Sequence, residues 1–152
     1  MRRVKKLISI FALLVVAATT NETVTLKARD GKIDGTAKYQ PDIDDIGAWM
    51  NPATKVSWDF ELPKAGTYRV IVVYGCINAS AGTTFDVLVG NQKANGVVTG
   101  TGDWARHKEF DLGPVILRKA GAMKLEVVPR QKPQGALAVM NLQAVKLVRD
   151  ES

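Results

Sequence analysis

Hydrophobic and polar residues alternate most regularly near the middle of the chain, from Val56 to Leu62. Every second residue of this stretch is apolar, and the residues between are polar. Because successive side chains of a strand point to opposite faces of a sheet, the pattern predicts a strand with one buried and one solvated face. Trp58 is therefore expected in the core. Pro63 and Gly66 follow as turn residues, since proline fixes φ and glycine tolerates positive φ.

A second stretch, from Tyr68 to Tyr74, is apolar at every position except Arg69. It is rich in aromatic and β-branched residues, which favours a central strand covered on both faces, with Tyr68 in the core. Together the two stretches predict a hairpin. Such a hairpin cannot bury its apolar faces alone, so we expect a second sheet packed over it.

Shorter strands are predicted on both sides of this hairpin, separated by turn residues such as Gly90 and Asn91. They span residues 24–29, 83–89, 92–99, 104–112, 115–117, 123–128 and 138–148. After the first twenty residues no stretch has a sustained helical period. About eight to ten short strands with turns between them indicate an all-β fold, an antiparallel β-sandwich.

The segment from Pro41 to Gly47 is expected to be a loop, and it carries Asp42, Asp44 and Asp45. Clustered carboxylates suggest a calcium loop, but the EF-hand spacing, with its central glycine and distal glutamate, is absent. We interpret the segment as a solvated acidic loop.

The first twenty residues differ in kind from the rest. Four basic residues precede an apolar run from Leu7 to Ala18, about twelve residues where a membrane-spanning helix needs about twenty. Residues 1–20 are therefore predicted to be a secretory signal, cleaved between Ala18 and Thr20, that directs the protein outside the cell or to the periplasm. Residues 21–152 are expected to form one domain, with no membrane contact after cleavage.

The net charge of +6 is concentrated in this leader. Without it, seventeen basic residues face fifteen acidic ones, a net charge of +2. Such a balance offers no basic stripe for phosphates, so we expect no nucleic-acid partner. Separately, we expect the protein to be a monomer. The single cysteine, Cys76, is interpreted as a small buried residue, because the one base that could activate it, His107, lies on another segment.

Four segments, in this order, resemble a known group of proteins: WDFELPKAGTYRVIVVY, TFDVLVG, TGDWARHKEFDLGPVILRKAGAMKLEVV and MNLQAVKLV. They are similar to galactose-binding-like β-sandwiches with a jelly-roll topology. Within that group the chain resembles carbohydrate-binding modules of families 6 and 35, and the C-terminal domain of some bacterial α-L-fucosidases. The resemblance implies a non-catalytic domain that binds a glycan, an oligosaccharide or polysaccharide, without a cofactor.

The same resemblance implies the binding residues. It places a ring that stacks on sugar at Trp104 and a hydrogen-bonding amide at Asn141, with Trp49 and Asp103 as further candidates. A pyranose packs its C–H face on an aromatic ring, and asparagine offers its hydroxyls a donor and an acceptor together. The family usually has a second aromatic ring in the site, and the resemblance places that position at Ala48, next to Trp49. An alanine there argues against a clamp of two rings. In the alternative reading, Trp104 closes the end of the core and Asn141 bonds only to backbone.

Modules of this kind hold a structural calcium with two glutamates on the first strand and an aspartate on the last. The matching positions here are Lys27, Arg29 and Gln143. Two cations and an amide in place of three anions would repel a divalent cation, so we expect no metal.

The favoured function is therefore a secreted sugar-binding domain. A structural or protein-interaction sandwich without sugar affinity is the alternative. A small hydrolase using Asp42, Asp44 or Asp103 is disfavoured, because a glycosidase needs two carboxylates held across a cleft and no pair has readable support. His107 is expected to be an exposed residue, without the orienting carboxylate of a catalytic triad.

Overall fold

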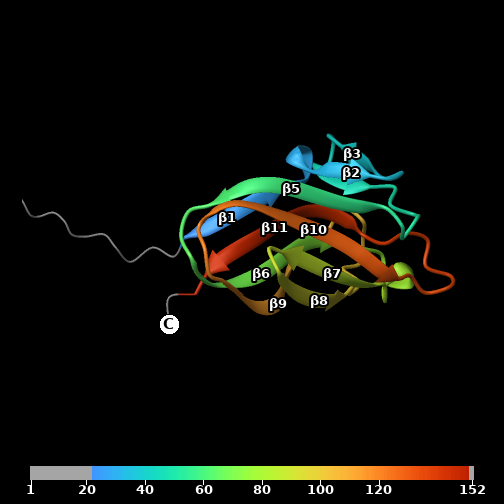
Figure 1. The fold of residues 1–152 in the computed structure, drawn as a ribbon. Coiled ribbons are helices and arrows are strands. Elements are labelled where there is room, and N and C mark those ends of the chain that lie inside the picture. Colours follow the sequence, from blue (N-terminus) through green and yellow to red (C-terminus); the bar gives the residue numbers. More distant parts are fainter. Residues whose placement is uncertain (1–21, 151–152) are drawn as a thin grey trace, which may run out of the picture.

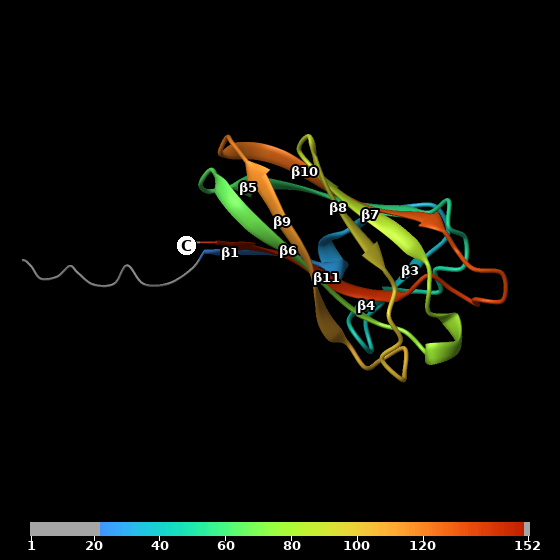
Figure 2. The ribbon, with the colours of Figure 1, turned by 90° about the horizontal axis from the view of Figure 1, so that it is seen from below.

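A computed structural model describes residues 22–150. Two antiparallel sheets pack face to face, as predicted (Figures 1 and 2). The first contains β1 (Thr23–Lys27), β3 (Lys38–Gln40), β4 (Asp45–Gly47), β6 (Gly66–Gly75), β9 (Lys108–Leu117) and β11 (Asn141–Arg149). Its order is β3-β4-β11-β6-β9, with β1 paired to β11.

The second sheet contains β2 (Lys32–Asp34), β5 (Lys55–Leu62), β7 (Thr84–Val89), β8 (Gln92–Val97) and β10 (Gly121–Gln131). Its order is β2-β5-β10-β7-β8. Two single-turn 3₁₀ helices complete the described elements, η2 (Ala28–Asp30) and η3 (Asn78–Ser80).

The central pair of strands does not form the predicted hairpin. β5 pairs with β2 and β10, whereas β6 pairs with β9 and β11 in the opposite sheet. The turn after Leu62 therefore crosses from one sheet to the other. This arrangement buries the inward face of both strands in a shared core, where Trp58 and Tyr68 lie as predicted.

Only one face of β6 is fully covered. Val70 and Val72 point into the core, while Arg69 on the other face forms an ion pair with Asp111, 2.6 Å from Nε to Oδ2. The prediction that both faces of this strand are buried is thus only partly right. Apolar β-branched residues do not distinguish a doubly covered strand from one whose outer face is half-exposed.

Two further predictions need correction. The segment expected to be an acidic loop contains β4, which pairs with β3 and β11. The two strands expected at residues 104–112 and 115–117 are one strand, β9, and its register with β6 shifts beside Pro114. Proline cannot donate to the ladder, so an irregularity rather than a break accommodates it.

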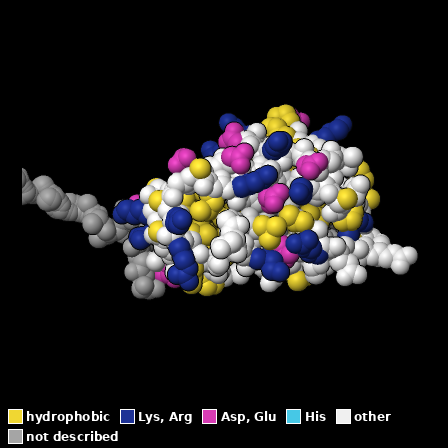
Figure 3. Space-filling model, viewed as in Figure 1, with side chains coloured by type: hydrophobic (Ala, Val, Ile, Leu, Met, Phe, Trp, Pro, Cys, Tyr) yellow, Lys and Arg dark blue, Asp and Glu magenta, His cyan; other side chains and the backbone are white. Residues whose placement is uncertain are grey.

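Charged side chains of both signs are interspersed on the surface seen in Figure 3, and no continuous basic stripe crosses this face. In the part of the chain that the structure describes, no helix has the length and apolar character needed to cross a membrane. The predicted leader, residues 1–20, lies outside the described residues. Cys76 is buried, and burial raises the pKa of its thiol to about 11, so the thiol is protonated at neutral pH.

Candidate functional site

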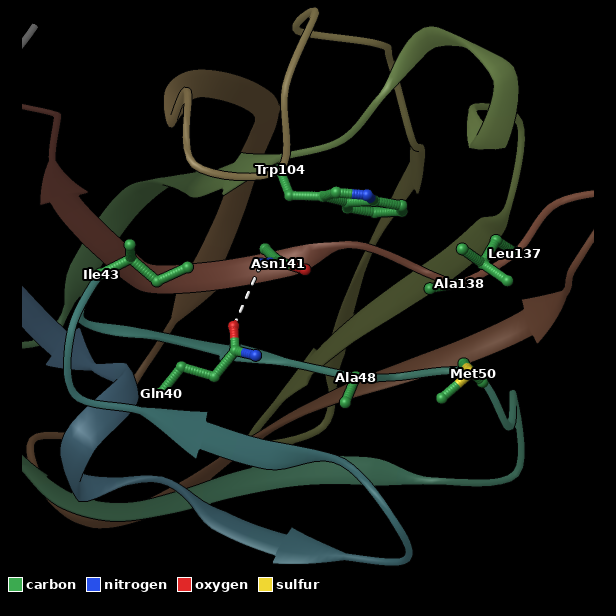
Figure 4. A pocket seen from close by; sticks show the side chains of 8 residues that line it. All are labelled: Gln40, Ile43, Ala48, Met50, Trp104, Leu137, Ala138 and Asn141. Atoms are coloured by element: carbon green, nitrogen blue, oxygen red, sulfur yellow. Dashed lines mark hydrogen bonds between the residues drawn. The ribbon is translucent and has the colours of Figure 1, made fainter.

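A pocket of about 300 Å³ opens at the end of the sandwich where β9 and β11 begin (Figure 4). It is lined by Gln40, Ile43, Ala48, Met50, Trp104, Leu137, Ala138 and Asn141. Trp104 lies on one side and Ala48 and Met50 on the other (Figure 4). Trp104 is the one aromatic residue among the eight, and no lining side chain is ionisable.

A glycine, Gly75, allows Trp104 and Asn141 to line the same pocket. Gly75 is the register partner of Asn141 where β6 ends, and a Cβ on Gly75 would overlap the carbonyl oxygen of Trp104. The loop before β9 can therefore cross the end of β6 only where no side chain stands. Thr101 ties the loop down: its N–H donates to the carbonyl of Cys76 at 2.8 Å, and its Oγ1 accepts from the N–H of Cys76 at 3.0 Å.

Asp103, predicted to contact a ligand, shapes this loop instead. Its Oδ1 accepts a hydrogen bond from the backbone N–H of Ala105 at 2.9 Å, and its carboxylate is not part of the pocket lining. Asp103 thus sets the turn that presents Trp104. The indole of Trp104 is half-buried and packs against the core, and its remaining surface lines the pocket.

Trp49, the other predicted contact residue, is fully buried, and the prediction that it binds ligand is wrong. Its Nε1 donates to the carbonyl of Thr54 at 3.1 Å, and its own carbonyl accepts from Val139 at 2.7 Å. Ala48 adopts a positive φ of 51° and lines the pocket. The side chain of Trp49, the next residue, points into the core. A methyl group therefore stands opposite Trp104, where a second ring would form a clamp.

Asn141, on β11, is 6% exposed and reaches the pocket floor. Its Nδ2 donates to Oδ2 of Asp45 at 3.1 Å and to Oε1 of Gln40 at 3.3 Å. Both partners of the amide are side chains, not the backbone groups of the alternative reading. Within residues 22–150, no donor reaches its Oδ1.

Behind Asn141 lies a buried acid, Asp45, paired with a largely buried base, His107, and the prediction that His107 is exposed and has no carboxylate partner is wrong. Asp45 is fully buried rather than solvated, and its Oδ2 is 2.8 Å from Nε2 of His107, whose side chain is 12% exposed. Burial raises the pKa of the Asp45 carboxyl, and the hydrogen bonds from His107 and Asn141 only partly offset this. The two residues are 62 positions apart, so no local spacing signals the pair.

A second cavity, of about 490 Å³, lies on the outer face of the six-stranded sheet. It is lined by Thr25, Lys27, Asp44, Val73, His107, Lys108, Glu109, Gln143, Ala144 and Lys146. Lys27 and Gln143, two of the positions matched to the family's calcium ligands, are here, and Arg29 pairs with Asp44 at 3.9 Å. No group of three or more His, Cys, Asp or Glu side chains suited to a metal occurs between residues 22 and 150.

Comparison with known proteins supports the fold. No model of a known protein family matches the chain. The chain is 28% identical over 116 residues to mannan endo-1,4-β-mannosidase B of Piromyces sp., a match covering 72% of this chain and 20% of that protein. The chain therefore spans about a fifth of the length of this curated relative.

Solved structures agree. The GH26-CBM35 β-(1,4)-mannanase of Podospora anserina superposes with a TM-score of 0.63 at 17% identity, covering 86% of this chain and 28% of that one. A family 35 carbohydrate-binding module from Clostridium thermocellum gives 0.63 at 16% identity, covering 83% and 97%. The predicted resemblance to family 35 modules is thus confirmed at the level of the β-sandwich fold.

Proposed function

We propose that this protein is a non-catalytic glycan-binding domain and that the Trp104 pocket holds the sugar. One observation carries the proposal: a half-buried indole faces an apolar wall, and the amides of Asn141 and Gln40 stand at the edge between them. An indole and an apolar wall fit the C–H faces of a pyranose, and the amides fit its hydroxyls. No carboxylate lines the pocket, so it is suited to binding without hydrolysis.

The favoured ligand is a neutral β-1,4-linked mannan. A uronate would need a cationic partner, and the lining residues supply none, while the buried Asp45 lies directly behind Asn141. Among neutral glycans, mannan is the first choice because the mannanase of Piromyces and that of Podospora are both similar to this chain. We also propose that the domain, residues 21–152, acts as a monomer outside the cell or in the periplasm after removal of residues 1–20.

The alternative, a sandwich that binds another protein and no sugar, is favoured by one feature. Met50 and Leu137 on the pocket rim are 54% and 61% exposed, and exposed apolar side chains are typical of protein contacts. The same two residues extend the apolar wall that a sugar ring would pack on, so the feature is compatible with both functions.

Native affinity electrophoresis separates the two functions. The protein should be retarded in gels containing galactomannan and migrate normally in gels containing polygalacturonate. Trp104→Ala should abolish the retardation, whereas Ile116→Ala, which shortens an exposed side chain on β9 that does not line the pocket, should not. Normal migration in every neutral polysaccharide tested, or equal retardation of Trp104→Ala, would refute the proposal.

A further inference from the structure

Two amide side chains that line the pocket, those of Asn141 and Gln40, form a hydrogen-bonded chain with a buried carboxylate behind them, that of Asp45. Oδ2 of Asp45 accepts from Nδ2 of Asn141 at 3.1 Å, and the same Nδ2 donates to Oε1 of Gln40 at 3.3 Å. Asp45 itself does not line the pocket, whereas the other two do. The chain thus connects a residue inside the protein to two groups at its surface (Figure 4 shows the Asn141–Gln40 link).

The chemistry of a carboxylate determines how both amides are oriented. An ionised carboxylate only accepts hydrogen bonds, so Asn141 must turn its NH₂ group toward Asp45. The second proton of that NH₂ group then requires an acceptor, so Gln40 must turn its oxygen toward Asn141. What remains for a ligand is Oδ1 of Asn141, an acceptor, and Nε2 of Gln40, a donor.

We propose that Asp45 is a positioning residue that fixes the hydrogen-bond polarity of the pocket. The inference rests on the proposed function, because it specifies how the same pocket selects its sugar. A bound pyranose would donate one hydroxyl to Oδ1 of Asn141 and offer a neighbouring oxygen to Nε2 of Gln40. The pocket would therefore select sugars by the orientation of adjacent hydroxyl groups.

The surroundings of Asp45 suit this role. His107 holds Oδ2 from the other side at 2.8 Å, while Oδ1 is buried without a partner in the described part of the chain. All of the hydrogen bonding of this carboxylate is thus directed through the oxygen that orients Asn141. Gly47 makes room for the two amides, because a Cβ there would overlap Oε1 of Gln40 and lie 3.0 Å from Nδ2 of Asn141.

Proton exchange of the side-chain amides, measured by NMR on the full chain without ligand, tests the inference directly. Both Nδ2 protons of Asn141 should exchange more slowly than the Nε2 protons of Gln40, because only the former are bonded within the protein. Asp45→Asn keeps the size of the side chain but can donate as well as accept. It should speed the Asn141 exchange by roughly tenfold, the loss of one hydrogen bond.

Asp44→Asn is the matched control. It removes the same charge one residue away, and Asp44 bonds to Tyr39 and pairs with Arg29 but contacts neither amide. It should leave the exchange of Asn141 unchanged. Equal exchange of the Asn141 and Gln40 protons in the parent protein, or no effect of Asp45→Asn, would overturn the inference.

Titration with β-1,4-mannohexaose separates this inference from the proposed function. In the parent protein, the sugar should slow the exchange of the Nε2 protons of Gln40 and leave the exchange of the Nδ2 protons of Asn141 unchanged. New protection of the Asn141 protons by the sugar would overturn the polarity assigned here. If the sugar shifts neither amide, the proposed mannan binding fails, and exchange in the free protein alone decides the role of Asp45.

Discussion

The two cavities of this sandwich lie on opposite sides of the hydrogen-bonded pair of Asp45 and His107, and they differ in the charge of their lining residues. The Trp104 pocket has an aromatic ring, an apolar wall and two amides, with no ionisable lining residue. The cavity on the outer face is larger and lined by three lysines and two acids. His107 borders the outer cavity, and its partner Asp45 bonds to Asn141 in the pocket.

The comparison indicates which of the two cavities is suited to a sugar. The pocket offers a sugar both stacking and directional hydrogen bonds. The outer cavity has cations where the family resemblance implies anions, so it suits neither a divalent metal nor an apolar sugar face. Function is therefore expected at the end of the sandwich and not on the face of its sheet.

The largest effect is expected from the tryptophan that faces away from both cavities. Trp49→Ala should lower the free energy of unfolding by about 3–5 kcal/mol, the usual cost of removing a fully buried large aromatic side chain. Chemical denaturation would measure it. A loss below about 1 kcal/mol, the range of surface substitutions, would mean that the ring is not in the core.

Two amides on β11 provide a matched pair, one in each cavity. Asn141→Ala should weaken mannohexaose binding by roughly 1–3 kcal/mol, since it removes the amide that would bond to the sugar hydroxyls and takes one hydrogen bond from Asp45. Gln143→Ala, two residues along the same strand in the outer cavity, should leave affinity unchanged. Isothermal titration calorimetry would compare them, and equal losses would place the sugar elsewhere.

A second ring should strengthen the pocket. Ala48→Trp puts an indole opposite Trp104, and an added aromatic contact contributes about 1 kcal/mol. The expected tightening is thus roughly fivefold to tenfold by calorimetry. Lys27→Trp, which adds the same ring in the outer cavity, is the control and should leave affinity as in the parent. Weaker binding by the Ala48 variant would show that the sugar occupies the space against Ala48 itself.

The smallest expected effect is that of calcium. A metal that binds only the native state raises its stability by mass action, and Lys27, Arg29 and Gln143 stand at the matched positions. Thermal melts with calcium chloride and with chelator should give the same Tm. A clear upward shift with calcium would contradict the account of the outer cavity.

Local pattern predicted the fold well and the site in part. The alternation around Trp58 correctly identified the buried face of β5. A period of two residues does not tell which strand is the neighbour, so the sequence could not predict that the chain crosses to the other sheet after β5. Family resemblance named Trp104 and Asn141, which line the same pocket, and their contact with sugar stays a prediction. It could not reveal Asp45 and His107, because an acidic residue in a polar segment is buried only when a distant base reaches it.

The most direct test of the central claim is a map of where a sugar contacts the protein. In ¹⁵N-labelled protein titrated with β-1,4-mannohexaose, amide shifts should cluster on the pocket residues, and nuclear Overhauser effects should join the indole protons of Trp104 to sugar C–H protons. Shifts centred on Lys27, Gln143 and Lys146, without contacts to Trp104, would contradict the claim.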